Sequence, residues 1–155
     1  MKYFSVKDWD DWKEDAENEV AYRSYIETIQ TQLPSDLQLL LRDTGSLSLN
    51  DGEIESISAS IENASVDIIL NGKWIIDATI GDRIFHLAYT EVVSFVSTID
   101  PAAGGIHFSG YGFHGLDEME VIEAGIYEHR MLFTGGIELA IRFRDFTLTY
   151  IDPKP

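Results

Sequence analysis

The C-terminal stretch from Ile122 to Tyr150 constrains the fold most strongly, because its side chains alternate as they do in a β-hairpin. After a turn at Thr134–Gly136, apolar side chains occupy every second position from 137 to 143. This period of two predicts a strand with one apolar face and one mostly charged face. At Arg144-Asp145 the phase slips by one residue, which predicts a β-bulge or a sharp bend at that point.

The first third of the chain has the periodicity of helices. Apolar residues recur at spacings of three and four between Asp8 and Leu33, and Asp8 is a suitable N-cap. Pro34 cannot continue the hydrogen-bond ladder, so the first helix should end there. We expect Ser35 to cap a short second helix from Asp36 to Arg42.

From Ser46 onwards the period changes to two. Asn71-Gly72 predicts a tight hairpin that joins the strand at 66–70 to a strand at 73–80. Further strands are expected at 57–61, 83–89 and 92–99. The sequence therefore predicts a single α+β domain over residues 1–155, with two N-terminal helices packed on a predominantly antiparallel sheet of about seven strands.

Charge is the strongest global property of the chain. Eleven basic against 27 acidic residues give a formal net charge of -16. This charge repels phosphate backbones and anionic lipid, so we expect neither nucleic acid nor a membrane as partner. It would attract a basic protein, although acidity also serves solubility alone. The absence of cysteine and of a signal-peptide-like apolar run predicts a cytoplasmic protein.

Catalytic signatures are missing from the sequence. It contains no HExxH, GxSxG, phosphate loop or GxGxxG, which favours a protein that is not an enzyme and needs no cofactor. The glycine-rich segment 100–117 holds the best candidates for ligand binding, because imidazoles and carboxylates share it with flexible backbone. These candidates are His107, Tyr111, His114 and Asp117. The alternative is that a loop collects polar residues whether or not it binds anything.

Two other groups of residues have alternative interpretations. Trp9 and Trp12 lie one helical turn apart beside Asp10, so they could anchor a basic partner or simply pack in the core. His129 and His86 each lie within an apolar strand pattern, which favours hydrogen-bonded histidines in or beside the core.

Two motifs carry a family resemblance. The segment LNDGEIESI (49–57) and the later EHRMLFTGGIELAIRFRDF (128–146) resemble a group of small, uncharacterised bacterial domains of unknown function. Similar small acidic domains occur among the immunity proteins of bacterial toxin systems. The resemblance implies an N-terminal helix and a final β-hairpin, and Asn50 stands where these proteins carry a histidine.

Three functional hypotheses follow. The first is a non-enzymatic, immunity-like interaction domain that binds a basic protein through its acidic surface. The alternative is a small-ligand or metal-binding domain, or an enzyme, centred on the glycine-rich segment 100–117. A third hypothesis is a homodimer that pairs through an exposed strand edge.

Overall fold

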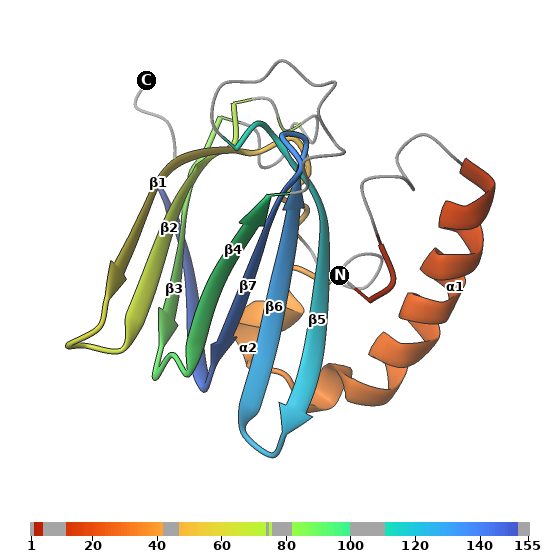
Figure 1. Ribbon diagram of the computed structural model, residues 1–155, viewed down its shortest axis with the longest axis horizontal. Helices are drawn as coiled ribbons and strands as arrows, with labels where there is room; N and C mark the ends of the chain where they lie inside the picture. The colour runs from red at the N-terminus through yellow and green to blue at the C-terminus, as the bar shows by residue number, and fades with distance from the viewer. Residues whose placement is uncertain are drawn as a thin grey trace.

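The computed structural model describes residues 2–4, 12–41, 47–73, 75, 82–99 and 111–151. Within this part of the chain the fold is α+β, as predicted, with eight strands that pair only in antiparallel fashion (Figure 1). The single sheet that we expected is instead two four-stranded sheets. Sheet A has the order β1-β2-β3-β8, and sheet B has the order β4-β7-β6-β5.

Sheet A combines three strands from the middle of the chain with the last strand. Its members are β1 (Glu53–Ser60), β2 (Ser65–Asn71), β3 (Ile84–Thr90) and β8 (Asp145–Ile151). Alternate residues of β2 and β3 are buried, as their period-two patterns predict. They form one half of the core between the two sheets.

Sheet B contains the C-terminal meander and one strand that precedes it. Its members are β4 (Ser94–Ile99), β5 (His114–Glu123), β6 (Ile126–Phe133) and β7 (Ile137–Phe143). The fully buried Met131, Leu139 and Phe143 belong to the face that packs against sheet A. The opposite face carries Glu118, Arg130 and Arg142, so sheet B has the charged outer face that its alternation predicts.

The phase slip at Arg144 is a sharp bend, as one of our two interpretations predicted. Phe143 ends β7 in sheet B, and Asp145 begins β8 in sheet A. The segment from β3 to β4 makes the same change of sheet. β3 pairs with β8 in sheet A, and β4, which follows β3 in the chain, pairs with β7 in sheet B. Two bent segments thus form the corner that joins the sheets, with Glu91 at a φ of 50° in the left-handed region.

The Asn71-Gly72 hairpin was wrongly predicted. Asn71 pairs with Ile84, and β2 has β1 on one side and β3 on the other, so no place beside β2 remains for a strand at 73–80. Gly72 is needed for close packing instead, because a Cβ there would lie 2.9 Å from the carbonyl oxygen of Arg83 and from the Phe85 ring. Most of 73–80 lies outside the described residues.

Two helices flank the sheets. Helix α1 (Trp12–Ile29) continues through a 3₁₀ turn, η2 (Gln30–Gln32), and the chain then reaches Pro34, where the helical segment ends as predicted. Helix α2 (Ser35–Gln38) is shorter than expected, and Ser35 does not cap it. Pro34 occupies the N-cap position without a side-chain hydrogen bond. Figure 1 shows α1 alongside β5, whereas α2 packs against β8.

No helix in the described ranges is long and apolar enough to cross a membrane.

Candidate functional site

The predicted ligand-binding residues are only partly described. His107 lies outside the described residues, as do Trp9 and Asp10 of the predicted partner-binding group. Trp12 is the first residue of α1, but its side chain is also outside the description. The other three predicted residues are described: Tyr111 lies just before β5, His114 is the first residue of β5, and Asp117 is the fourth.

His114 lies in the interior rather than at a surface. His114 is only 3% exposed. Its ring packs edge-on against the ring of Phe133, which also contacts Tyr111. Neither ring nitrogen makes a hydrogen bond of ordinary geometry with a described residue, although the backbone of Leu49 lies close enough to favour the protonated ring. Burial lowers the pKa of His114, although the Asp117 carboxylate acts in the opposite direction. The ring is therefore held neutral in an apolar environment.

The backbone of His114 connects β5 to the segment that precedes β1. The amide of Asp51 donates to the His114 carbonyl at 2.8 Å, and the His114 amide donates to the Gly52 carbonyl at 2.7 Å. The side-chain nitrogen of Asn50 can donate to the Gly115 carbonyl at 2.7 Å. The Asn-Asp-Gly motif and the glycine-rich segment therefore meet in space, a contact that nothing in the sequence spacing indicated.

A second buried histidine links the two sheets. The Tyr89 hydroxyl on β3 lies 2.8 Å from Nδ1 of His129 on β6, and both residues are fully buried. Burial raises the pKa of Tyr89 well above its ordinary value, so the hydroxyl keeps its proton. Because Nε2 of His129 faces a carboxylate, we assign the ring proton to Nε2, which makes Nδ1 the acceptor from Tyr89. This carboxylate is that of Asp117, whose Oδ2 lies 3.5 Å from Nε2. The prediction that His129 is a hydrogen-bonded core histidine is confirmed.

This buried cluster of Tyr89, His114, Asp117 and His129 stabilises the fold more readily than it supports catalysis. Tyr89, His114 and His129 are at most 3% exposed, so a substrate could not reach them in this conformation. No three histidine, aspartate or glutamate side chains in the described part of the chain are arranged to hold a metal ion. The geometry therefore gives a hydrogen-bonded connection between the two sheets, with the buried imidazole of His114 on a neighbouring position of β5.

His86 differs from our expectation. It lies on the outer face of sheet A with its side chain 42% exposed, and its Nε2 is 2.8 Å from Oδ1 of Asp67. It is a paired surface histidine, because its position in β3 has the opposite parity to the buried Phe85 and Leu87.

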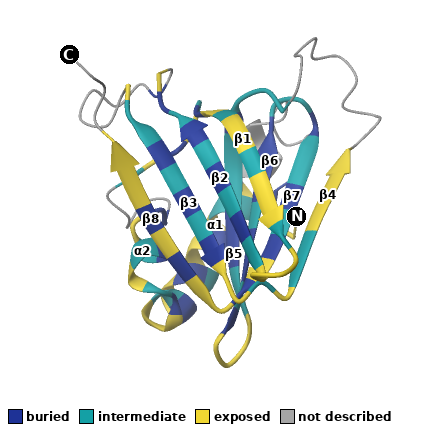
Figure 2. Cartoon of the chain, turned by 90° about the vertical axis from the view of Figure 1, so that its left-hand side faces the viewer, coloured by how far each residue is buried: buried dark blue, intermediate teal, exposed yellow. Residues whose placement is uncertain are grey.

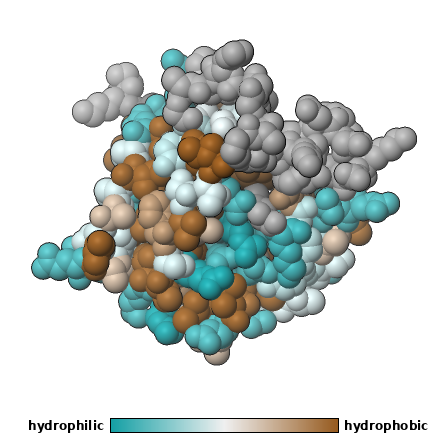
Figure 3. Space-filling model, viewed as in Figure 1, coloured by the Kyte–Doolittle hydropathy of each residue, from teal (hydrophilic) through white to brown (hydrophobic). Residues whose placement is uncertain are grey.

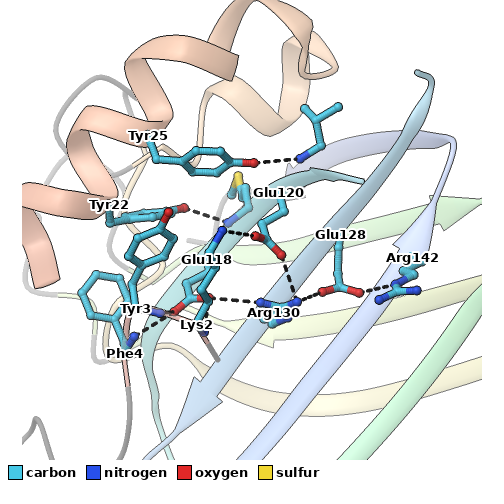
Figure 4. Close-up of polar contacts among 12 residues, drawn as sticks. Lys2, Tyr3, Phe4, Tyr22, Tyr25, Glu118, Glu120, Glu128, Arg130 and Arg142 are labelled. Carbon is cyan, nitrogen blue, oxygen red and sulfur yellow. Dashed lines mark hydrogen bonds and ion pairs between the residues drawn. The ribbon is translucent and has the colours of Figure 1, made fainter. Parts of the chain in front are cut away.

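The outer face of sheet B carries a ladder of charged side chains (Figure 4). Arg130 on β6 contacts three carboxylates: Glu120 at 2.9 Å, Glu118 at 3.4 Å, and Glu128. Burial opposes the charge of Arg130, but these three carboxylates raise its pKa overall. Glu128 also pairs with Arg142 on β7. The charges on this face are therefore largely neutralised within the chain.

Glu118 holds the N-terminal segment against this ladder. Its carboxylate accepts hydrogen bonds from three successive backbone amides, those of Lys2, Tyr3 and Phe4, at 2.8, 2.6 and 2.8 Å (Figure 4). Glu118 is only 1% exposed. A buried carboxylate requires such donors to replace its lost hydration, so the arrangement is a structural clamp for residues 2–4.

Comparison with known proteins identifies no relative: no protein-family model matches the chain, and no curated protein matches it. The family resemblance carried by residues 49–57 and 128–146 thus stays a prediction.

The two outer faces differ sharply in charge. No lysine or arginine occurs in any of the four strands of sheet A, which instead carry the carboxylates of Glu53, Glu55, Asp67 and Asp145. Sheet B, in contrast, carries Arg130 and Arg142 beside the carboxylates of Glu118, Glu120, Glu128 and Glu138 on its outer face. Figure 2 views sheet A from outside and shows no helix in front of it. Among the described residues, no helix covers the outer face of sheet A, and the strands of this sheet carry negative charge only, apart from His86.

Proposed function

We propose that this chain is a non-enzymatic interaction protein of the immunity type, which binds a basic protein through the outer face of sheet A. The observation that carries the proposal is that the strands of sheet A contain carboxylates and no lysine or arginine, whereas the outer face of sheet B carries both signs of charge. The face is bounded by Glu55 of β1 and Asp145 of β8, with Asp67 between them. A surface of one sign attracts a partner of the opposite sign and repels others.

Four basic side chains of the described residues have partners within the chain: three pair with carboxylates, and the fourth lies over an aromatic ring, where it keeps its charge. Lys2 pairs with Glu120 at 3.0 Å, and Arg130 and Arg142 pair with the carboxylates of sheet B. Arg83 lies over the Tyr150 ring at 4.4 Å. With a net charge of -16 on the whole chain, the excess of carboxylates remains available to a partner.

The side chains between these carboxylates suit a protein partner. Ser56, Ser58, Thr147 and Thr149 belong to the outer face of sheet A, together with the exposed Asp67–His86 pair. Ile69 and Ile84 lie on the same face, so it has apolar as well as polar side chains. Apolar side chains with carboxylates at the margin of the face are compatible with a protein interface that has an apolar centre and a polar rim.

The test is a pull-down from the native host at low salt, followed by titration of the recovered protein against the purified chain. We expect a basic partner whose association rate falls steeply as salt is raised. The double variant Glu55→Lys/Asp145→Lys should weaken binding by at least about tenfold, a loss of roughly 1.4 kcal/mol. Recovery of no partner, or binding that salt does not change, would contradict the proposal.

A matched control places the same change in charge elsewhere. Glu17→Lys/Glu27→Lys alters two exposed carboxylates on α1 and leaves sheet A unchanged. If both double variants weaken binding equally, the partner senses only net charge and the outer face of sheet A is not the binding surface.

Small-ligand binding near residues 111–117 is the second candidate function. One observation favours it: neither nitrogen of the buried His114 imidazole has a hydrogen bond of ordinary geometry among the described residues. A ligand that supplied such a hydrogen bond should raise the melting temperature of the native chain but not of His114→Phe. A metabolite and metal thermal-shift screen tests this, and equal shifts in both proteins would exclude His114 as a ligand.

A further inference from the structure

Each of the two sheets has two edges, and unpaired edge strands tend to associate with other chains unless they are protected. On the β5 edge, the amides of Met119 and Val121 donate to the hydroxyls of Tyr22 and Tyr25 on α1, at 2.7 and 3.3 Å (Figure 4). On the β8 edge, the Leu148 amide donates to the Asp36 carboxylate at 3.0 Å. Both edges are thus capped by side chains of the helical segment.

The β1 edge is protected by other means. It carries the exposed carboxylates of Glu53 and Glu55, its register shifts between Ile54 and Ser56, and Glu53 forms a bridge with Phe113. Charges and bulges on an edge strand disfavour pairing with a further strand.

The β4 edge has none of these protections in the described part of the chain. Its sequence, SFVSTI, contains no charged residue, no proline and no glycine. Within the described residues its only strand neighbour is β7. The last four residues of β4 are exposed, with Val96 at 49% and Ile99 at 69% (Figure 2). Exposed valine and isoleucine on an uncharged edge favour strand addition.

We propose that β4 pairs in antiparallel fashion with β4 of a second copy of this chain, about a twofold axis at Val96. The two B sheets then become one continuous eight-stranded sheet. A twofold interface brings the same surface patch of both copies together, so the strand must be complementary to itself. The cross-strand partners of β4 on β7 show that this condition is met.

The central row of the joined sheet is apolar. Val96 pairs with Ala140 within one copy, so the order across the outer face is Ala140, Val96, then Val96 and Ala140 of the second copy. Directly opposed β-branched side chains stabilise a strand pair, and both valines lose their exposure.

The flanking rows are complementary in charge. Ser94 pairs with Arg142 and Thr98 pairs with Glu138 within one copy. With the axis at Val96, Ser94 lies opposite Thr98 of the second copy. Each flanking row therefore runs from Arg142 of one copy to Glu138 of the other across two small hydroxyl side chains. Because each row has a positive charge at one end and a negative charge at the other, local electrostatics favour this register.

Salt should act on this dimer in the opposite direction from its action on a complex with a basic protein. Two chains of net charge -16 repel each other at long range, and salt screens this repulsion. The dimer should therefore strengthen as salt is raised, whereas binding to a basic partner weakens. The response to salt therefore distinguishes the β4 dimer from the binding of a basic protein by sheet A, and either can be absent without the other.

Sedimentation velocity over a range of protein concentrations, at low and at moderate salt, tests the proposal. We expect a monomer–dimer equilibrium that shifts towards dimer with salt. Val96→Lys places two positive charges opposite each other and should raise the dimer dissociation constant by on the order of tenfold or more. Val20→Lys on α1 is the matched control, because Val20 is 64% exposed, and it should leave the equilibrium unchanged. A chain that is monomeric at every soluble concentration, or two variants with equal effects, would overturn the proposal.

Cysteine cross-linking tests the register, since the chain has no cysteine of its own. Val96→Cys should form an interchain disulfide under mild oxidation, whereas Val20→Cys should not. Ser94→Cys alone should remain uncross-linked but should react when mixed with Thr98→Cys, because these positions face each other only in the proposed register. Cross-linking of Ser94→Cys with itself would show that the register is wrong.

Discussion

The hydroxyl of Tyr89 and Nδ1 of His129 lie 2.8 Å apart, and this hydrogen bond joins β3 of sheet A to β6 of sheet B. The two residues are 40 positions apart in the sequence, and among the described residues the next polar contact of His129 is the 3.5 Å between its Nε2 and Asp117. The bond therefore contributes to how the sheets are packed against each other.

Removing this hydroxyl should destabilise the fold. Tyr89→Phe keeps the ring and its contacts with Phe143 and Phe146, but it leaves Nδ1 of His129 buried without a donor. An unsatisfied buried acceptor costs about 1–3 kcal/mol, so we expect a loss of that size in the free energy of unfolding. Urea denaturation measures it, with Tyr150→Phe, at an exposed position, as the control. A loss no larger than the control would show that the bond contributes little.

Stability should fall at alkaline pH. Burial raises the pKa of both Tyr89 and Tyr22 well above the ordinary value of 10.0. Both hydroxyls keep their protons in the folded state after the unfolded chain has lost them, so the stabilisation is complete below pH 10.0 and declines as the pH rises further. Tyr89→Phe removes one of the two groups, so its free energy of unfolding should decline less steeply above pH 10.0 than that of the native chain. Equal slopes would contradict the assignment.

Mild acid should destabilise the protein through His114. Burial lowers its pKa below the ordinary 6.5, so the unfolded chain takes up a proton before the folded chain does. Its contribution to stability is present above pH 6.5 and is lost as the pH falls towards the folded-state pKa. Comparing the free energy of unfolding at about pH 7.5 and about pH 5.5 measures the loss. His114→Phe should reduce it, because phenylalanine fills a similar volume without a titrating group. An unchanged pH dependence would assign the loss to other groups.

The Glu118 clamp gives a prediction about the N-terminal segment. Glu118→Ala removes the acceptor of three backbone amides and one contact of Arg130. Hydrogen bonds to a charged group contribute about 1.5–3 kcal/mol each, and we expect a net loss of about 3 kcal/mol because water replaces some of them. Hydrogen exchange at the amides of Tyr3 and Phe4 should accelerate strongly. Glu123→Ala, at an exposed position of the same strand, should change neither quantity.

Local patterning predicted most of the strands and the class of the fold. The alternation in 66–70, 83–89 and 137–143 identified β2, β3 and β7, since burial of one face requires a period of two. The phase slip at Arg144 correctly indicated a bend, because a strand that changes sheets must exchange its inward-facing parity. Pro34 likewise marked the end of the first helical segment, because it has no amide for the helical ladder.

Pairing partners could not be read from the sequence. The Asn71-Gly72 dipeptide favours a local hairpin, yet β2 pairs with β3 across a longer connection, because its buried Val66, Ile68 and Leu70 match Tyr89, Leu87 and Phe85. The position of His86 on the solvent face also depends on which parity of β3 meets the core. The local turn preference of a dipeptide is therefore smaller in free energy than the burial of a whole apolar strand face.

The sequence by itself determined the alternation, the excess of acidic residues and the absence of cysteine and catalytic motifs. Only the tertiary structure decided that Arg130 and Arg142 share the outer face of sheet B, that no lysine or arginine enters a strand of sheet A, and that side chains of the helical segment cap the β5 and β8 edges. The physical reason is that periodicity fixes which side chains share a face of one strand, whereas the charge of a whole face and the fate of an edge depend on which strands become neighbours.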